Sequence, residues 1–384
     1  MPFSLPAPLA LLALVAIGLL GSLSSTAAAF ETAARAAIVV DHRTGQELYA
    51  KNPDLPVPPA SMSKLMTALM VFEEIKAGRL KLEDTLPVSE KAWRTGGSKM
   101  FVKVGDRVKV SDLLRGMIVQ SGNDACVVFA EALAGSEAAF AERMNRRAAE
   151  IGLTHSRFKN ATGLHDPEHV MSVRDLARLA SRIIREHPDL YKIYSEKEFE
   201  YAKIRQPNRN PLLQAGVPGV DGVKTGYTEE AGYGLVVSAE RDGRRIVAVL
   251  AGLETLRQRR TEAELLLEYG FREFQEYRLF AAGETVVEVP VWLGASWTVP
   301  AVPAETVGVT IRREERKDLK VTARFDAPRP APIAKGEEIG RLEISVPSRP
   351  TLSVPLVAGA EVERAGLIGR LTGAVVHLVR GGGA

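Results

Sequence analysis

Three short segments of the chain place hydroxyl, amine and amide side chains at spacings that suit nucleophilic catalysis. The first is Ser61-Met62-Ser63-Lys64. Residues three apart on a helix share a face, so Ser61 and Lys64 can meet, whereas Ser63 points elsewhere. A serine hydroxyl needs a base, and a lysine can act as one only if burial or a nearby cation keeps it neutral. Taken alone, the segment also fits a serine that merely caps a helix.

The second segment is Ser121-Gly122-Asn123, and the third is Lys224-Thr225-Gly226. The apolar residues around the second predict a tight turn that opens into a buried helix, so by itself it also fits a capping turn. The third predicts an ammonium and a hydroxyl on a strand edge, where a glycine lets backbone or substrate approach closely. Each of the three segments is a weak signal alone. Their occurrence together, in this order, is a strong signal for catalysis by a nucleophilic serine.

Alternating β-like runs and amphipathic stretches between residues 30 and 275 must position these groups. The alternation predicts a mixed α/β or α+β domain. Proline is tolerated in the first turn of a helix, so Pro58-Pro59 indicates where one helix begins, and Gly78 indicates where it ends. The expected elements are a strand at 37–40, a helix from Pro58-Pro59 to about Gly78, helices at 111–133 and 136–151, and strands at 234–238 and 246–250 joined by the turn Asp242-Gly243.

Composition excludes several classes of protein. The chain has 384 residues, of which 46% are hydrophobic and 25% charged, so it can build a sizeable core and two or three domains. Its net charge of +3, from 50 basic and 47 acidic residues, gives no electrostatic case for a nucleic-acid partner. The single cysteine, Cys126, permits no internal disulfide or cysteine metal site and is expected to be a packed core thiol.

The sequence changes character after Gln275. Short, often alternating apolar runs punctuated by prolines predict a small β-sandwich-like module at 276–357. Within it, the charged run 312–317 is expected to be a solvated turn or an edge strand.

Both ends of the chain carry apolar segments. Residues 7–21 and the following Ala27-Ala28-Ala29 fit a signal peptide cleaved before Phe30, although no Lys or Arg precedes the apolar run, and an uncleaved anchor or a buried helix is the alternative. Residues 362–380 predict a helix with one apolar face, suited to lying in a membrane interface or docking on a core. That face contains Leu367, Ile368, Leu371, Val375, Leu378 and Val379, opposite Glu363, Arg370 and His377.

The three motifs and their surroundings resemble the low-molecular-weight D-alanyl-D-alanine carboxypeptidases of peptidase family S11. The resemblance rests on PASMSKLMTALM, GGSKMF, SGNDACVVFAE, FKNATGL and VDGVKTGYTEEAGY, and more weakly on PIAKGEEIGRLEI. It implies an α/β (α+β) β-lactamase/transpeptidase-like domain with a helical subdomain, then a small β-rich sandwich-like domain and a C-terminal amphipathic helix. The expected boundaries are 1–29 for the signal peptide, 30–275, 276–357, and 358–384 for the anchor. No metal or organic cofactor is implied.

The resemblance also implies a role for each matching residue. Ser61 would attack the substrate carbonyl, Lys64 would accept its proton, and Ser121 with Lys224 would relay that proton to the leaving amine. Asn123 would orient the substrate amide and Lys64. The remaining implied residues are Thr225, Gly226 and Arg259 for the substrate and its carboxylate, with Arg260 and Arg245 as weaker choices, and the backbone N–H groups of Ser61 and Tyr227 for the oxyanion. Tyr227 departs from the histidine that several members have there.

The implied substrates are peptidoglycan stem peptides ending in D-Ala-D-Ala, with β-lactam antibiotics as inhibitors. The implied location is the outer face of the cytoplasmic membrane, after export, with the terminal helix on the membrane surface. A class A β-lactamase would also need a Glu-x-x-Leu-Asn segment, and the chain contains no Leu-Asn pair. A DD-endopeptidase and a catalytically silent penicillin-binding wall protein are the remaining alternatives.

Overall fold

The computed structural model describes residues 30–366, so the signal-peptide prediction for 1–29 lies outside the described residues. Contacts divide the chain into two compact units, 1–32 and 33–384, and every helix and strand below belongs to the second. Residues 33–273 contain β1 (Ala36–Asp41), β2 (Glu47–Lys51), the 3-10 helix η1 (Ala60–Ser63), α1 (Lys64–Lys76), β3 (Thr85–Pro87), α2 (Glu90–Arg94), β4 (Arg107–Lys109), α3 (Val110–Ile118), α4 (Asn123–Ala134), α5 (Glu137–Glu150), α6 (Val173–Glu186), α7 (Pro188–Tyr191), η2 (Lys192–Ser195), β5 (Glu198–Tyr201), β6 (Ile204–Pro207), α8 (Pro211–Gln214), β7 (Val220–Thr228), β8 (Gly232–Arg241), β9 (Arg244–Leu253) and α9 (Leu256–Glu273). Residues 274–366 contain β10 (Phe274–Phe280), β11 (Val287–Trp292), β12 (Thr298–Pro303), β13 (Val307–Arg312), η3 (Arg313–Asp318), β14 (Lys320–Arg324), β15 (Arg329–Pro330), β16 (Glu338–Ser345) and β17 (Leu352–Ala358).

A five-stranded antiparallel sheet, in the order β2-β1-β9-β8-β7, organises residues 33–273. The middles of β8 and β9 are buried, which explains their continuous apolar sequences. The predicted turn between them is confirmed: Asp242 and Gly243 both have positive φ, as a two-residue hairpin turn of type I′ requires. Strand β1 pairs with β9, which lies about 200 residues later in the sequence, and Val39 is opposite Ala248.

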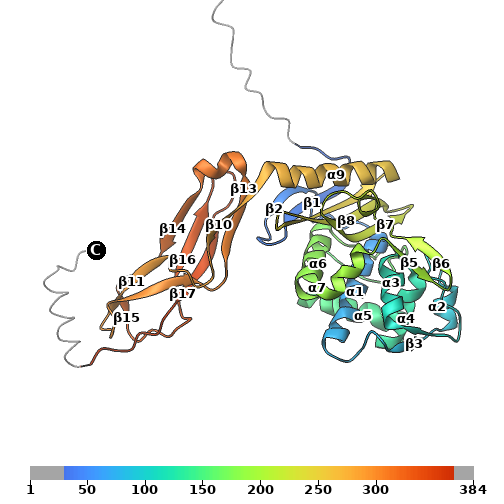
Figure 1. The fold of residues 1–384 in the computed structure, drawn as a ribbon, viewed down its shortest axis with the longest axis horizontal. Coiled ribbons are helices and arrows are strands. Elements are labelled where there is room, and N and C mark those ends of the chain that lie inside the picture. The colour runs from blue at the N-terminus through green and yellow to red at the C-terminus, as the bar shows by residue number, and fades with distance from the viewer. Residues whose placement is uncertain (1–29, 367–384) are drawn as a thin grey trace, which may run out of the picture. The chain divides into compact units, whose positions relative to one another are not determined.

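Helices cover both faces of this sheet. Helix α9 packs on one face and α6 on the other, and helices α1 to α5 and α7 lie on the α6 side (Figure 1), whereas α8 contacts α9. Helix α1 contacts α3, α4, α5 and α6, and apolar side chains surround it. A helix that is apolar all round belongs in the interior of a domain. The first turn of α1 is consequently held on every side, which fixes the residues that begin it.

The helix predicted over 111–133 is wrong as a single element. The structure divides it into α3 and α4, with Ser121 in the left-handed region at φ +62° between them. The amide of Gly122 reaches back across the break to the carbonyl of Gly116 over 2.8 Å. The tight turn expected at Ser121-Gly122-Asn123 is thereby confirmed, and it presents Ser121 away from either helix axis.

Residues 274–366 form the β-rich region that the sequence predicted. A six-stranded sheet, in the order β14-β16-β17-β12-β11-β15, and the pair β10-β13 enclose a separate apolar core. The run 312–317 is not an edge strand: 313–318 is an exposed 3-10 turn, where the Glu315 carboxylate accepts from the Arg312 amide over 2.9 Å.

The predicted C-terminal helix is wrong for its first residues. Val362 exchanges backbone hydrogen bonds with Ile333 at 2.9 Å, and the amide of Ala365 donates to Leu293, so residues 362–365 belong to the β-rich region. The rest of that prediction, 367–380, lies outside the described residues. Within 30–366, no helix is both long and apolar enough to cross a membrane.

Candidate active site

Ser61 and Lys64 meet at the start of helix α1. The side-chain nitrogen of Lys64 donates to Ser61 Oγ over 2.7 Å and to the Thr162 carbonyl over 2.5 Å. Lys64 is only 1% exposed, whereas Ser61 is half-buried and stays accessible. The predicted juxtaposition of hydroxyl and amine is therefore present, with the amine inside the domain and the hydroxyl at its surface.

The backbone around this pair is held by a loop that follows α5. The Asn160 carboxamide oxygen accepts from the amide and hydroxyl of Thr162 and from the amide of Gly163, which fixes the Thr162 carbonyl opposite Lys64. Ala60, directly before the serine, has φ +47°, a conformation that costs a non-glycine residue about 1–2 kcal/mol. Such strain persists only where the surroundings impose it, and this loop supplies them.

Ser121 and Lys224 form a second hydroxyl–amine pair. Lys224 lies on β7, the edge strand of the sheet, and its side-chain nitrogen donates to Ser121 Oγ over 3.0 Å and to the Thr225 carbonyl over 3.2 Å. Both residues are at most 3% exposed. The turn between α3 and α4 thus delivers its serine to the strand that carries the third motif.

Electrostatics hold both lysines toward their neutral forms. Burial lowers the pKa of Lys64 to about 8, and the cation of Arg209 adds to that effect. Burial also lowers the pKa of Lys224 well below its ordinary value, followed by the charges of Lys64 and Arg209. A lysine with its pKa near 8 is partly neutral at physiological pH and can accept a proton.

Sequence reasoning missed Arg209 and the Thr162 carbonyl. Arg209 follows β6 and donates to the Gln120 carbonyl over 3.1 Å, next to Ser121. No motif marks it, since RQPNRN reads as an ordinary polar loop. The segment FKNATGL did contain a signal, because an asparagine two residues before a threonine and three before a glycine fits a side-chain-stabilised turn.

Asn123 faces the loop 96–102. Within residues 30–366 its side-chain nitrogen donates to the Gly96 carbonyl over 2.8 Å and not to Lys64, and its Oδ1 is buried without a protein partner. The neighbouring Asp124 carboxylate accepts from the backbone amides of Met100, Phe101 and Val102. The start of α4 and this loop are therefore tied together by side chain and backbone.

The third motif lies close to the serine through its glycine. A Cβ atom at Gly226 would come within 2.7 Å of the Pro59 carbonyl, so β7 and the start of η1 pack at backbone distance. Thr225 is buried. Tyr227 is 51% exposed and stacks on Tyr233, with ring centroids 4.3 Å apart, so its side chain lies on the surface.

Of the three arginines considered for carboxylate recognition, Arg259 has the most suitable surroundings. It is 8% exposed, its guanidinium lies 5.5 Å from the Tyr233 ring, and its charge contributes to lowering the pKa of Lys224. Arg260 is exposed. Arg245 is engaged elsewhere, because it pairs with Asp221 over 2.7 Å and with Glu240 over 2.6 Å.

Other reactive groups play no visible part. Burial raises the pKa of the Cys126 thiol to about 12, and its sulfur lies 3.3 Å from the Gly122 carbonyl, as expected of a core thiol. Over residues 30–366, no three His, Cys, Asp or Glu side chains gather in a way that could hold a metal ion.

The fold and this arrangement define a class: active-site serine hydrolases in which a buried lysine stands where others use histidine. A family model described as D-alanyl-D-alanine carboxypeptidase matches residues 23–255, and one described as penicillin-binding protein 5, C-terminal domain, matches 274–364. The chain belongs to the D-alanyl-D-alanine carboxypeptidase family, and it is a serine-type D-Ala-D-Ala carboxypeptidase that works through an acyl-serine intermediate.

Individual relatives agree along most of the chain. It is 40% identical over 345 residues to the D-alanyl-D-alanine carboxypeptidase DacC of Escherichia coli, covering 88% of this chain and 86% of that one. Penicillin-binding protein 5 from Haemophilus influenzae has a similar structure, with a TM-score of 0.83, 36% identity, and coverage of 87% and 99%. The ampicillin-bound penicillin-binding protein D2 of Listeria monocytogenes matches with a TM-score of 0.58 and 32% identity over 63% of this chain and 98% of that chain.

Proposed function

We propose that Ser61 is the nucleophile and Lys64 its base. The observation that carries this assignment is the 2.7 Å hydrogen bond between them, made by an amine whose burial brings its pKa to about 8. Neutral Lys64 takes the hydroxyl proton while Ser61 Oγ bonds to the carbonyl carbon of the penultimate D-alanine. The carbonyl oxygen becomes an oxyanion between the backbone N–H groups of Ser61 and Tyr227, each worth about 3–4 kcal/mol to the transition state.

The second pair relays to the leaving group the proton that Lys64 took from Ser61, which leaves Lys64 neutral again. As the tetrahedral intermediate collapses, the C–N bond to the terminal D-alanine breaks and its amine takes a proton through Ser121, whose hydroxyl bonds to Lys224. Water then attacks the acyl-serine carbonyl while neutral Lys64 takes one of its protons. The C–Oγ bond breaks, Lys64 returns that proton to Ser61 Oγ, and the shortened peptide leaves with a new carboxyl group. Asn123 orients the substrate amide through the side chain that the Gly96 carbonyl holds in place.

The substrate's terminal carboxylate needs a cation and a hydrogen-bond donor close to β7. We assign the terminal carboxylate to Thr225 and Arg259, with Gly226 allowing the peptide to approach the strand. The substrates proposed are peptidoglycan stem peptides ending in D-Ala-D-Ala. β-Lactams, which the Listeria relative binds as ampicillin and cefotaxime, are proposed to acylate the same serine.

One experiment tests this assignment: intact-protein mass spectrometry after penicillin exposure, paired with D-alanine release from diacetyl-Lys-D-Ala-D-Ala. We expect an adduct on Ser61 and release of D-alanine. An adduct without release would favour an endopeptidase or a silent binding protein. Folded protein that gives neither signal would overturn the assignment of Ser61.

We further propose that 1–29 is a removed signal peptide, that 30–275 is the catalytic domain, and that the chain end after the β-rich region binds the outer surface of the cytoplasmic membrane. The proposal rests on the apolar sequence of 7–21 and the amphipathic pattern of 367–380. Because residues up to Ala365 pair within the β-rich region, the truncation to make removes 367–384 only.

That truncation should release the exported protein from membranes without lowering its activity on a soluble peptide. Leu371→Asp, on the predicted apolar face, should weaken sedimentation with membranes, whereas His377→Asp on the opposite face should not. A truncated protein that still sediments fully with membranes after signal cleavage would contradict the anchor.

A further inference from the structure

A cavity of about 340 Å³ lies between helix α6 and the turn that joins β1 to β2, and none of the active-site residues lines it. Its basic residues all come from α6, at positions 174, 178, 182 and 185, spacings that place side chains on one helical face. One acid, Glu47, also lines the cavity. The lining therefore carries four guanidinium groups and one carboxylate.

Two of these four arginines are committed to carboxylates. Arg174 pairs with Asp54 over 2.6 Å and also with Glu47, which removes the single acid of the lining. Arg182 meets Glu186 over 3.1 Å, one turn further along the helix, but remains 30% exposed. Arg174 therefore forms a wall of the cavity, and Arg182 keeps donors that face solvent.

The other two arginines keep most of their donors available. Arg178 donates to the Gly152 carbonyl over 3.1 Å, and the nearest carboxylate oxygen, on Asp175, is 3.9 Å away. Arg185 is exposed, and no hydrogen bond or ion pair of its side chain is formed within residues 30–366. The planar fork of a guanidinium matches the oxygens of phosphate and carboxylate groups.

Two buried polar atoms on the same lining add to the basic cluster. The hydroxyl of Ser181 and Nδ1 of His42 are both shielded from solvent, and neither has a hydrogen-bond partner in the described part of the chain. Burial, followed by the charges of Arg245 and Arg185, lowers the pKa of His42 to about 4, so its ring is neutral at pH 7. Buried polar groups are normally paired, so these two atoms indicate a polar ligand.

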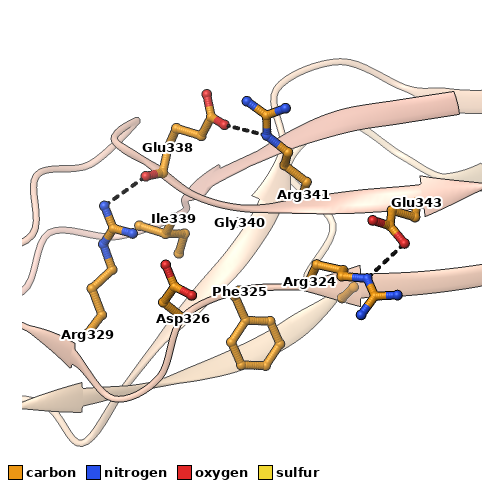
Figure 2. Close-up of a pocket in the computed structure, with 10 residues that line it drawn as sticks. Arg324, Phe325, Asp326, Arg329, Glu338, Ile339, Gly340, Arg341 and Glu343 are labelled. Atoms are coloured by element: carbon orange, nitrogen blue, oxygen red, sulfur yellow. Dashed lines mark hydrogen bonds and ion pairs between the residues drawn. The ribbon is translucent and has the colours of Figure 1, made fainter.

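A larger cavity in the β-rich region shows what an ordinary charged lining looks like. Its three arginines are matched by three acids, and Figure 2 shows Arg324 and Arg341 paired with glutamates of the lining, while Arg329 donates to the Glu338 carbonyl and also pairs with Glu337. Among them, Arg324 meets Glu343 over 2.8 Å and Arg341 meets Glu338 over 3.2 Å. That lining selects no sign of ligand charge, in contrast to the one on α6.

We propose that the α6 cavity binds a small organic phosphate, whose oxyanion lies among Arg178, Arg182 and Arg185 and accepts from the Ser181 hydroxyl. The rest of the ligand packs on the apolar floor, which Ile38, Val40, Ile151 and Ala177 provide. A dianion is favoured because several guanidinium groups line the same cavity. The ligand is either free in solution or the phosphate-bearing end of a larger wall or lipid molecule.

Isothermal titration calorimetry with glycerol 3-phosphate tests the site, with glycerol, inorganic phosphate and chloride of equal ionic strength as comparisons. We expect saturable binding of glycerol 3-phosphate, weaker binding of inorganic phosphate, and none of glycerol or chloride. Equal weak heats from every salt would show non-specific ion binding and overturn the site. If vesicles of phosphatidylglycerol phosphate compete with glycerol 3-phosphate, the ligand is the lipid headgroup. If they do not compete, the ligand is a free organic phosphate.

Matched variants locate the binding. Arg182→Gln/Arg185→Gln should weaken the affinity at least about tenfold, and Ser181→Ala about threefold. Lys109→Gln/Arg146→Gln removes the same charge from exposed residues outside the cavity and should change the affinity less than about twofold. Arg185→Gln alone, at an exposed residue, serves if the double variant does not fold. Equal losses in both double variants, or no loss in the first, would place the anion elsewhere.

Discussion

Gly163 packs directly against the residue that precedes the proposed nucleophile: a Cβ atom on Gly163 would lie 2.0 Å from the carbonyl oxygen of Ala60. The two residues are far apart in sequence, and the contact presses the Asn160 loop onto the start of η1. The same loop presents the carbonyl that accepts from Lys64. The contact between Gly163 and Ala60 therefore helps to fix both where Ser61 lies and which carbonyl faces the amine of Lys64.

Gly163→Ala should lower kcat/KM on a D-Ala-D-Ala peptide by at least about a hundredfold, because the added methyl group must push Ala60 and Ser61 away from Lys64. Gly152→Ala is the matched control: its φ of +74° is nearly that of Gly163, at +78°, but none of the described residues lies within 4 Å of the Cβ that alanine would add. The control should lose about 1 kcal/mol of stability and keep its activity. Equal activity losses in both variants would contradict the contact argument.

Ser61→Ala should abolish covalent penicillin labelling and D-alanine release while the protein stays folded, because no other hydroxyl bonds to Lys64 in the described part of the chain. Ser63→Ala, two residues away, removes a buried hydroxyl that has no hydrogen-bond partner within residues 30–366 and should leave labelling intact. Mass spectrometry of the two variants after penicillin exposure makes the comparison. Labelling of Ser61→Ala at wild-type stoichiometry would refute the assignment.

The kcat/KM of the enzyme should rise with pH through a midpoint near pH 8, the acid limb of its pH profile, because Lys64 becomes a base only as it loses its proton. Arg209→Gln removes a cation that lowers the pKa of both lysines, so the limb should move to higher pH and kcat/KM at pH 7 should fall about threefold. Arg209→Lys keeps the charge and should keep the limb in place. A profile that does not move in Arg209→Gln would remove Arg209 from this role.

The buried lysine should also make stability depend on pH. Its pKa is about 8 in the folded protein and 10.5 when unfolded, so between these values the unfolded chain binds more protons and stability rises with pH. Relative to Lys64→Met, the wild type should therefore gain up to about 3 kcal/mol in free energy of unfolding from pH 8 to pH 10.5. Denaturant titrations across this range measure the difference. A difference independent of pH would show that Lys64 is not desolvated.

Local patterns in the sequence were sufficient for several of the elements and for the motif residues. The helix after Pro58-Pro59, the turn at Asp242-Gly243 and the β-rich region follow from periodicity and from turn-forming residues, which depend on neighbours in the chain. The hydrogen bond between Ser61 and Lys64 could also be predicted from local sequence, because one helical turn separates the two residues. The catalytic roles of these residues remain predictions.

Contacts between distant residues were beyond such patterns. Lys64 bonds to a carbonyl 98 residues away, and Lys224 to a hydroxyl 103 residues away. The division of 111–133 into two helices depends on the Asp124 carboxylate and on the loop it holds, neither of which alters the apolar periodicity. Arg209 acts through its charge at a distance, and the pairing of Val362 with Ile333 overrides a helical pattern that continues beyond it.

The three amides held by the Asp124 carboxylate have a consequence for the thermodynamics of binding. The loop 96–102 also accepts from the backbone and side chain of Asn123, through the carbonyls of Ser98 and Gly96, so it is fastened at several points before any substrate arrives. Its conformational entropy is lost when the chain folds rather than when a peptide binds. The loop that holds Asn123 is consequently ordered in advance, and the free energy of peptide binding need not be spent on ordering it.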